Sequence, residues 1–199
     1  ETPASLPVEK GLRLADSAGD GLYLLVDLQR EEAGLLHLDI ALPEPARILI
    51  GFGEHLDDLR ARTSVGGRQF AAVYEARAGR QTFTHALKRA GCRYVQLHIY
   101  AHAATLYYAG VCPTVYPVDY RPAFHCADAL HNRIFEVSRR TLELCMHEHY
   151  EDCPWREQAL YAMDSRNQML CGYYVFQNKE FAASSLRLLA LGQREDGLL

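Results

Sequence analysis

The chain has 199 residues, of which 49% are hydrophobic and 23% are charged, and its formal net charge is −4. This composition is that of a folded globular protein and lies far from the range of disordered chains. The negative charge and the lack of a Lys/Arg cluster exclude a general nucleic-acid binder, and no apolar run approaches the roughly 20 residues that cross a bilayer. We therefore expect neither a nucleic-acid nor a membrane partner, and the oligomeric state stays open.

The six cysteines form no C-x-x-C pair, which disfavours a zinc ribbon. They stand in apolar segments, where a free thiol behaves as a small hydrophobic group. We expect reduced thiols, and the N-terminal residues show no signal-peptide pattern, so we expect a cytoplasmic location. Both ends of the sequence break off abruptly, which suggests a fragment of a longer protein.

The first part of the chain, residues 1–118, alternates apolar and polar residues with a period of two, which predicts an antiparallel β-sandwich. Turn signals such as Arg89-Ala90-Gly91 separate several of the segments. The expected strands are 22–29, 35–42, 46–53, 69–76, 81–87, 93–100 and 105–112. Residues 119–127 are expected to form a linker, because the prolines around it oppose strand pairing.

From Asp128 the period becomes helical, and residues 128–199 are predicted to be helices. Asp128 is the expected N-cap of a first helix that ends near Met146. Its apolar face is formed by Leu130, Ile134, Val137, Thr141 and Cys145. Asn178 marks a break, and 180–192 is predicted to be a further helix that ends at Gly192. Two or three helices cannot close a hydrophobic core alone. We therefore expect residues 128–199 to belong to a larger helical array.

The stretch "EDCPWREQALYAMDSRNQ", residues 151–168, mixes charges with bulky apolar groups. Asp152 before Pro154 is typical of a helix start, and on one helix Glu157, Tyr161, Asp164 and Gln168 would form a single stripe. Carboxylates that flank an aromatic ring suit a polyhydroxylated ligand. A carboxyl beside Trp155 and Tyr161 could also serve as a general acid. The simpler alternative is a solvated helix start in which Arg156 pairs with Asp152 or Glu157.

Other chemistry has little support in the sequence. Cys145, His147, His149 and Cys153 lie near one another but match no standard metal-binding spacing. We therefore predict no metal site and no cofactor.

The segment "DCPWRE" followed by Tyr161 and Asp164 resembles the Asp-Cys-Pro-x-Arg-Glu signature of bacterial α-L-rhamnosidases, the family 78 glycoside hydrolases. The resemblance extends to "FHCADALHNRIFEVSRRTLELCMHEHYEDCP" and, in the β part, to "GRQTFTHALKRAGCRYVQLHI". It implies a β-sandwich followed by the first helices of an incomplete (α/α)6 toroid, and an inverting exo-glycosidase with a carbohydrate substrate.

By position in the signature, Glu157 falls on the general acid, with a competing claim for Asp152. Arg156 and Asp164, with Asp152, fall on residues that bind sugar hydroxyls. Tyr161 stands where the family usually has a Trp that lines the sugar pocket, and Trp155 is a further candidate contact. The catalytic base of the family lies far downstream, beyond Leu199, so we expect these residues alone to be inactive.

The sequence departs from the signature after Glu157, where Gln158 replaces an Arg and Tyr161 replaces the Trp. These departures leave the sugar open. The alternatives are a toroidal glycosidase that acts on another sugar, such as a uronic acid, and a non-catalytic carbohydrate-binding protein.

Overall fold

The computed structural model describes residues 9–16, 19–119 and 124–198. Residues 120–123 of the predicted linker lie outside the described residues. The chain divides into two compact units, Glu1–Pro113 and Thr114–Leu199, which are described separately below. An antiparallel sheet is followed by three helices, which confirms the predicted fold class of β followed by α.

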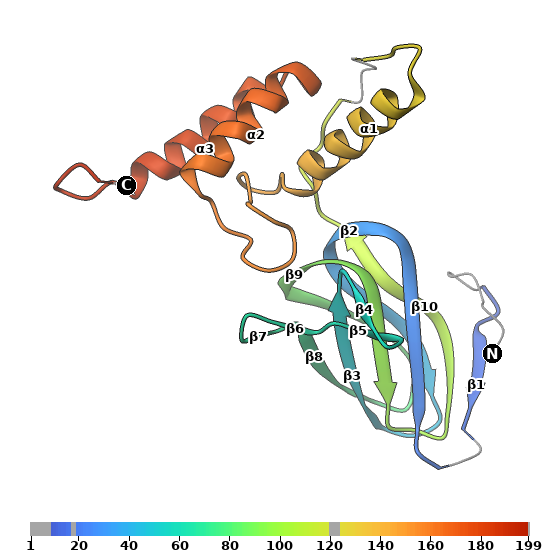
Figure 1. The fold of residues 1–199 in the computed structure, drawn as a ribbon. Coiled ribbons are helices and arrows are strands. Elements are labelled where there is room, and N and C mark those ends of the chain that lie inside the picture. Colours follow the sequence, from blue (N-terminus) through green and yellow to red (C-terminus); the bar gives the residue numbers. More distant parts are fainter. Residues whose placement is uncertain (1–8, 17–18, 120–123, 199) are drawn as a thin grey trace. The chain divides into compact units, whose positions relative to one another are not determined.

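The first unit is built on one antiparallel sheet with the strand order β1-β10-β2-β9-β3-β8 (Figure 1). Its strands are β1 (Leu12–Ala15), β2 (Leu22–Leu42), β3 (Ala46–Gly53), β8 (Ala71–Ala76), β9 (Gly79–Ile99) and β10 (Ala103–Pro113). Two short hairpins connect β3 to β8. They consist of β4 (Leu56–Asp57) with β5 (Arg60–Ala61), and β6 (Ser64–Val65) with β7 (Arg68–Gln69).

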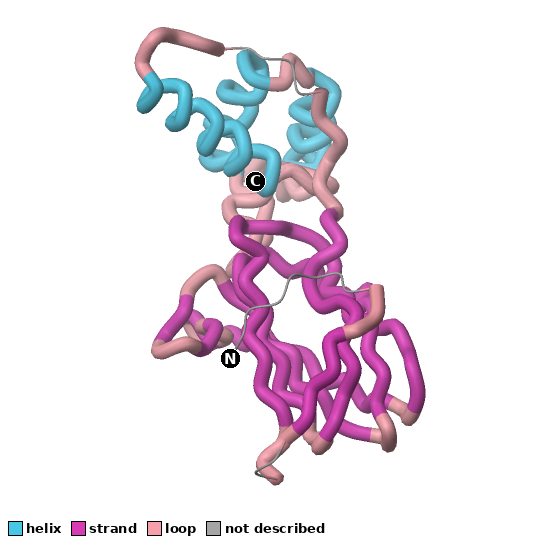
Figure 2. The backbone as a smooth tube through the Cα atoms, turned by 90° about the vertical axis from the view of Figure 1, so that its right-hand side faces the viewer, coloured by secondary structure: helices cyan, strands magenta, loops and turns pink. Residues whose placement is uncertain are grey.

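Strands β2 and β9 are long enough to run through both halves of the sheet, and they curve along their length (Figures 1 and 2). The β2–β9 register shifts between Asp27 and Glu32 and again between Leu35 and His37. On one side of these shifts β9 also pairs with β3, and on the other side β2 pairs with β10. The curvature therefore replaces the separate sheets of a simple sandwich with one sheet that folds over its own core.

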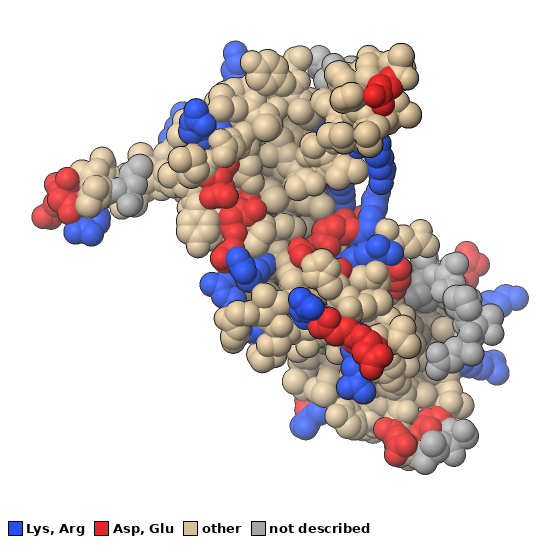
Figure 3. All heavy atoms as spheres, in the orientation of Figure 1, with Lys and Arg blue, Asp and Glu red and all other residues tan. Residues whose placement is uncertain are grey.

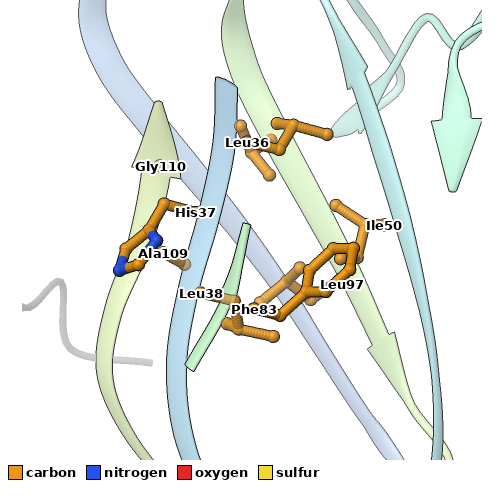
Figure 4. Close-up of a pocket in the computed structure, with 9 residues that line it drawn as sticks. Leu36, His37, Leu38, Ile50, Phe83, Leu97, Ala109 and Gly110 are labelled. Atoms are coloured by element: carbon orange, nitrogen blue, oxygen red, sulfur yellow. The ribbon is translucent and has the colours of Figure 1, made fainter. Parts of the chain in front are cut away.

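The core of this unit is apolar and tightly filled. Leu38 comes from one half of the sheet, and Ile50 and Leu97 come from the other, and all three line the same narrow cavity (Figure 4). The cavity measures only ≈ 10 Å³, about the space of one water molecule, so it cannot hold a sugar ring. Alternate residues along β2, β3 and β9 are buried here, as the period of two predicts.

Two predicted breaks are wrong. Segments 22–29 and 35–42 belong to the single strand β2, and segments 81–87 and 93–100 belong to β9. The expected turn at Arg89-Ala90-Gly91 is part of β9, because Ala90 and Gly91 pair with Gly34 and Ala33 of β2.

The second unit holds α1 (Ala129–Leu144), α2 (Ala162–Val175) and α3 (Lys179–Leu191). The predicted N-cap is confirmed, since the Asp128 carboxylate accepts a hydrogen bond from the Leu130 N–H at 2.7 Å. Asn178, the predicted break, caps α3 by accepting from the Phe181 N–H at 3.0 Å. No helix within the described ranges is long and apolar enough to span a membrane.

The helical unit has a small core in which Phe181 of α3 is central. Its ring lies 4.7 Å from that of Tyr150 in an edge-on arrangement and 4.5 Å from that of Tyr116. The other buried members are Leu142, Met146, Met169, Phe176 and Ala182. The predicted apolar face of α1 is largely exposed, with Leu130 65% and Ile134 53% accessible.

Candidate active site

The segment between α1 and α2 forms a closed loop instead of the predicted helix start. The Asp152 N–H donates to the Ala159 carbonyl at 3.0 Å, and the Ala159 N–H donates to Asp152 Oδ1 at 2.9 Å. Gln158 has a φ of 53°, which a helix does not accept. The predicted helix from Asp152 is therefore wrong, and α2 begins only at Ala162.

The predicted stripe on one helix is wrong for the same reason. Asp164 and Gln168 lie in α2, whereas Glu157 lies in the loop and Tyr161 is the N-cap position of α2. Gln168 nevertheless holds the loop, because its Nε2 donates to the Glu151 carbonyl at 2.7 Å. The loop is thus fixed by its own closure and by one hydrogen bond from α2.

Inside the loop, Asp152, Cys153 and Glu157 form a compact group that we call the acid cluster. One oxygen or sulfur atom from each residue lies within 4.8 Å of the others. The Arg156 guanidinium donates to Glu157 Oε1 at 3.0 Å. The structure therefore brings together three of the predicted site residues, Asp152, Arg156 and Glu157. It also contains the Arg156–Glu157 pair of the simpler alternative, although in a loop and not at a helix start.

The surroundings of Asp152 lower the pKa of its carboxyl group. Burial, the largest single influence, acts to raise the pKa of Asp152. Hydrogen bonds from the Glu157 side chain, the Ala159 N–H and Cys153 outweigh it, and the net pKa is lowered. The Asp152 carboxylate is therefore held in its ionised form, and the Glu157 side chain is one of its hydrogen-bond partners.

The remaining predicted residues occupy different surroundings. Trp155 is buried, with 7% of its surface accessible, whereas Tyr161 is 48% accessible. Asp164 is exposed in the first turn of α2, where a carboxylate is favourable. Of the two aromatic side chains, Tyr161 is therefore the accessible one.

No functional role for Cys153 follows from the sequence alone. Its sulfur accepts the Glu157 N–H at 3.3 Å, and its S–H group lies 3.7 Å from Glu157 Oε2. The signal was its position inside the signature between Asp152 and Pro154. A cysteine among apolar residues otherwise suggests only a small hydrophobic group.

The acid cluster has the donor atoms for a metal ion, but its chemistry disfavours one. Burial raises the pKa of the Cys153 thiol, and a cysteine binds metals as the thiolate. Its S–H group and the two carboxyl groups already satisfy one another by hydrogen bonds. The arrangement fits proton transfer better than metal binding.

An apolar groove of ≈ 220 Å³ lies elsewhere in the helical unit, between α2 and α3. It is lined mainly by Met169, Leu170, Tyr173, Leu186 and Leu189. None of the acid cluster contributes to it. On the face of the molecule in Figure 3, acidic and basic side chains are interspersed, so no basic patch marks a binding surface there.

A sheet unit followed by helices is the arrangement that the resemblance to bacterial α-L-rhamnosidases implied. Residues 121–199 match the family described as the bacterial alpha-L-rhamnosidase 6 hairpin glycosidase domain. The predicted resemblance to the family 78 enzymes is thereby confirmed.

Two solved structures illustrate the likeness. The family 78 rhamnosidase of Bacillus sp. GL1 has 30% identity and a TM-score of 0.80, over 92% of this chain and 19% of that chain. A rhamnosidase from Klebsiella oxytoca, solved with rhamnose bound, shares the fold at 21% identity and a TM-score of 0.70, over 96% of this chain and 39% of that one. The present chain thus spans well under half the length of either structure. No curated protein matches its sequence.

Proposed function

We propose that this chain supplies the general acid of an inverting exo-glycosidase of the α-L-rhamnosidase type, and that Glu157 is that acid. The observation that supports the proposal is the acid cluster, in which Glu157 lies beside Asp152, a carboxyl group whose pKa is lowered. A general acid must hold its proton until the glycosidic bond begins to break, and a neighbouring ionised carboxylate makes it hold that proton.

In the proposed reaction, Glu157 protonates the glycosidic oxygen as it departs, which removes negative charge from the leaving group. Once Glu157 has given up its proton, it is a carboxylate beside the ionised Asp152. The repulsion between the two negative charges favours return of a proton to Glu157. Arg156, which holds Glu157 Oε1 at 3.0 Å, limits that repulsion. An inverting glycosidase also needs a carboxylate base roughly 6.5–9.5 Å from the acid. We place it in a part of the complete protein outside these 199 residues.

The proposed sugar site combines an aromatic face with acceptors. Tyr161 exposes its ring next to α2, and Asp164 exposes its carboxylate three residues later. A sugar presents C–H groups to such a ring and hydroxyl donors to such a carboxylate. The Klebsiella oxytoca structure has rhamnose bound, and we propose a terminal rhamnose or a closely related sugar as the substrate here.

The test is Glu157→Gln in a complete protein that contains this chain, assayed on aryl glycosides with good and poor leaving groups. We expect turnover on the poor leaving group to fall by about 10²–10⁴-fold, since that is the usual contribution of general acid catalysis. Turnover on the good leaving group should fall much less, because that group needs no proton.

Glu148→Gln is the matched control, because Glu148 is an exposed glutamate in the same interhelical segment. It should leave both rates unchanged. Near-normal turnover of Glu157→Gln on the poor leaving group overturns the assignment. Binding of sugars by the complete protein without any hydrolysis would favour the carbohydrate-binding alternative.

A further inference from the structure

Cys153 contacts Glu157 at both its backbone and its carboxyl group. The Cys153 sulfur accepts the Glu157 N–H at 3.3 Å, and its S–H group lies 3.7 Å from Oε2 of the same residue. The N–H groups of Gln158 and Arg156 also point at this sulfur. Cys153 therefore closes the turn that carries Glu157, as a serine or aspartate side chain closes the first turn of a helix.

The two oxygens of Glu157 have different partners. Arg156 donates to Oε1 at 3.0 Å, and Cys153 donates to Oε2. Arg156 itself is exposed, with 49% of its side chain accessible, so solvent competes with its hold on the carboxyl group. Cys153 is half-buried, and it is the better-shielded of the two groups that fix how the carboxyl is turned.

We propose that Cys153 is a positioning residue for the general acid, whose sulfur fixes the Glu157 backbone and whose S–H group orients the Glu157 carboxyl. This inference rests on the proposed role of Glu157 as the acid. It assigns Cys153 no covalent chemistry. A thiol nucleophile needs a low pKa, and burial, the largest influence here, raises that of Cys153.

The positioning role predicts a specific kinetic effect. A Glu157 carboxyl group that is free to rotate still lies near the substrate. It is less often oriented toward the leaving oxygen. Misplacement by about 1 Å costs up to 10²-fold in rate. Loss of Cys153 should therefore lower kcat on poor leaving groups and leave KM nearly unchanged.

The experiment compares Cys153→Ala, Cys153→Ser and Cys171→Ala in the complete protein on the same pair of aryl glycosides. We expect Cys153→Ala to lower kcat on the poor leaving group by about 10–10²-fold, with a much smaller loss on the good one. Cys153→Ser keeps a donor and an acceptor and should recover most of the loss. Cys171→Ala removes an exposed thiol of α2 and should change neither rate. Equal losses on both substrates, or no loss, overturn the proposal.

A second measurement does not depend on catalysis or on whether Cys153→Ala folds. Alkylation of Cys153 by iodoacetamide is followed by mass spectrometry, with the exposed Cys171 as the internal reference. Removal of its partner in Glu157→Ala should make Cys153 react several-fold faster relative to Cys171. An unchanged ratio overturns the contact between the two side chains. If Glu157→Gln lacks leaving-group dependence while the ratio changes, the acid assignment fails and the contact stands.

Discussion

Asp152 and Ala159 close the loop between α1 and α2 by a reciprocal pair of hydrogen bonds. The Asp152 N–H donates to the Ala159 carbonyl at 3.0 Å, and the Ala159 N–H donates to Asp152 Oδ1 at 2.9 Å. One carboxyl oxygen of Asp152 is therefore a structural acceptor, while its negative charge lies beside Glu157, the proposed general acid. These two roles can be separated by substitution.

Asp152→Asn retains the Oδ1 acceptor and removes the charge, whereas Asp152→Ala removes both. We expect Asp152→Asn to keep the thermal unfolding midpoint close to that of the parent and to lose activity on poor leaving groups. Asp152→Ala should lose activity and in addition about 1 kcal/mol of stability, the net value of one hydrogen bond. Calorimetry and the aryl glycoside assay measure the two effects. An equal loss of stability in both variants would contradict the loop-closing role.

The acid stability of the sheet unit should depend on Asp39. The Arg80 side chain, which donates to Asp39 Oδ2 at 2.8 Å, is the largest cause of the lowered pKa of Asp39. A carboxyl with a lowered folded-state pKa stabilises the protein above its unfolded value, 3.8, and the contribution is lost as the pH falls through the folded value. The Arg80 side chain is 57% accessible, so the effect is at most about 1 kcal/mol.

Asp39→Asn should therefore be less stable than the parent at pH 7, and the two should converge near pH 2 in urea unfolding experiments. Glu44→Gln, at an exposed position between β2 and β3, is the control and should show no such convergence. A gap that persists or widens at low pH would argue against the ion pair as the cause.

The sequence patterns predicted those features of the fold that depend on neighbouring residues, such as a strand and two helix caps. Segment 46–53 coincides with β3, whose large apolar residues at alternate positions, Ile48, Ile50 and Phe52, are buried. Asp128 and Asn178 were identified as a cap and a break from residue type alone, and both cap helices. The continuity of β2 was missed because the polar residues near Asp27 and Glu32 interrupt the apolar alternation where the strand bends.

The candidate site was predictable as a set of residues but not as a geometry. Asp152, Arg156 and Glu157 stand out in the sequence, and they lie together. Asp152 before Pro154 is also typical of a helix start, and no local rule reveals that its partner is Ala159. The role of Cys153 depends on that loop conformation, so it could not be inferred before the loop was known.

Gly34 permits the close approach of β2 and β10. A Cβ atom at this position would lie 2.0 Å from the Cys112 carbonyl oxygen, which is backbone and cannot turn aside. Gly34→Ala should therefore destabilise the protein by about 1–3 kcal/mol, as overpacking does. Gly192→Ala is the control, because its nearest neighbour is 3.3 Å away and it should change stability much less. Equal urea midpoints for the two variants would refute the steric argument.

Phe181 links the core of the helical unit to the loop between α1 and α2. It packs edge-on against Tyr150, at 4.7 Å between ring centres, and Tyr150 stands two residues before Asp152. Only 3% of Phe181 is accessible, so Phe181→Ala should cost about 3–5 kcal/mol in the free energy of unfolding. It should also speed amide exchange at Ala159, because the loop loses its support.

Leu188→Ala on the same helix is the matched control, since Leu188 is 41% accessible and its loss should cost far less. Phe181→Leu keeps most of the buried volume and should fall between the two. If exchange at Ala159 is unchanged in Phe181→Ala while the helical unit is destabilised, the loop is held by its own Asp152–Ala159 closure and by Gln168, and not by the core beneath it.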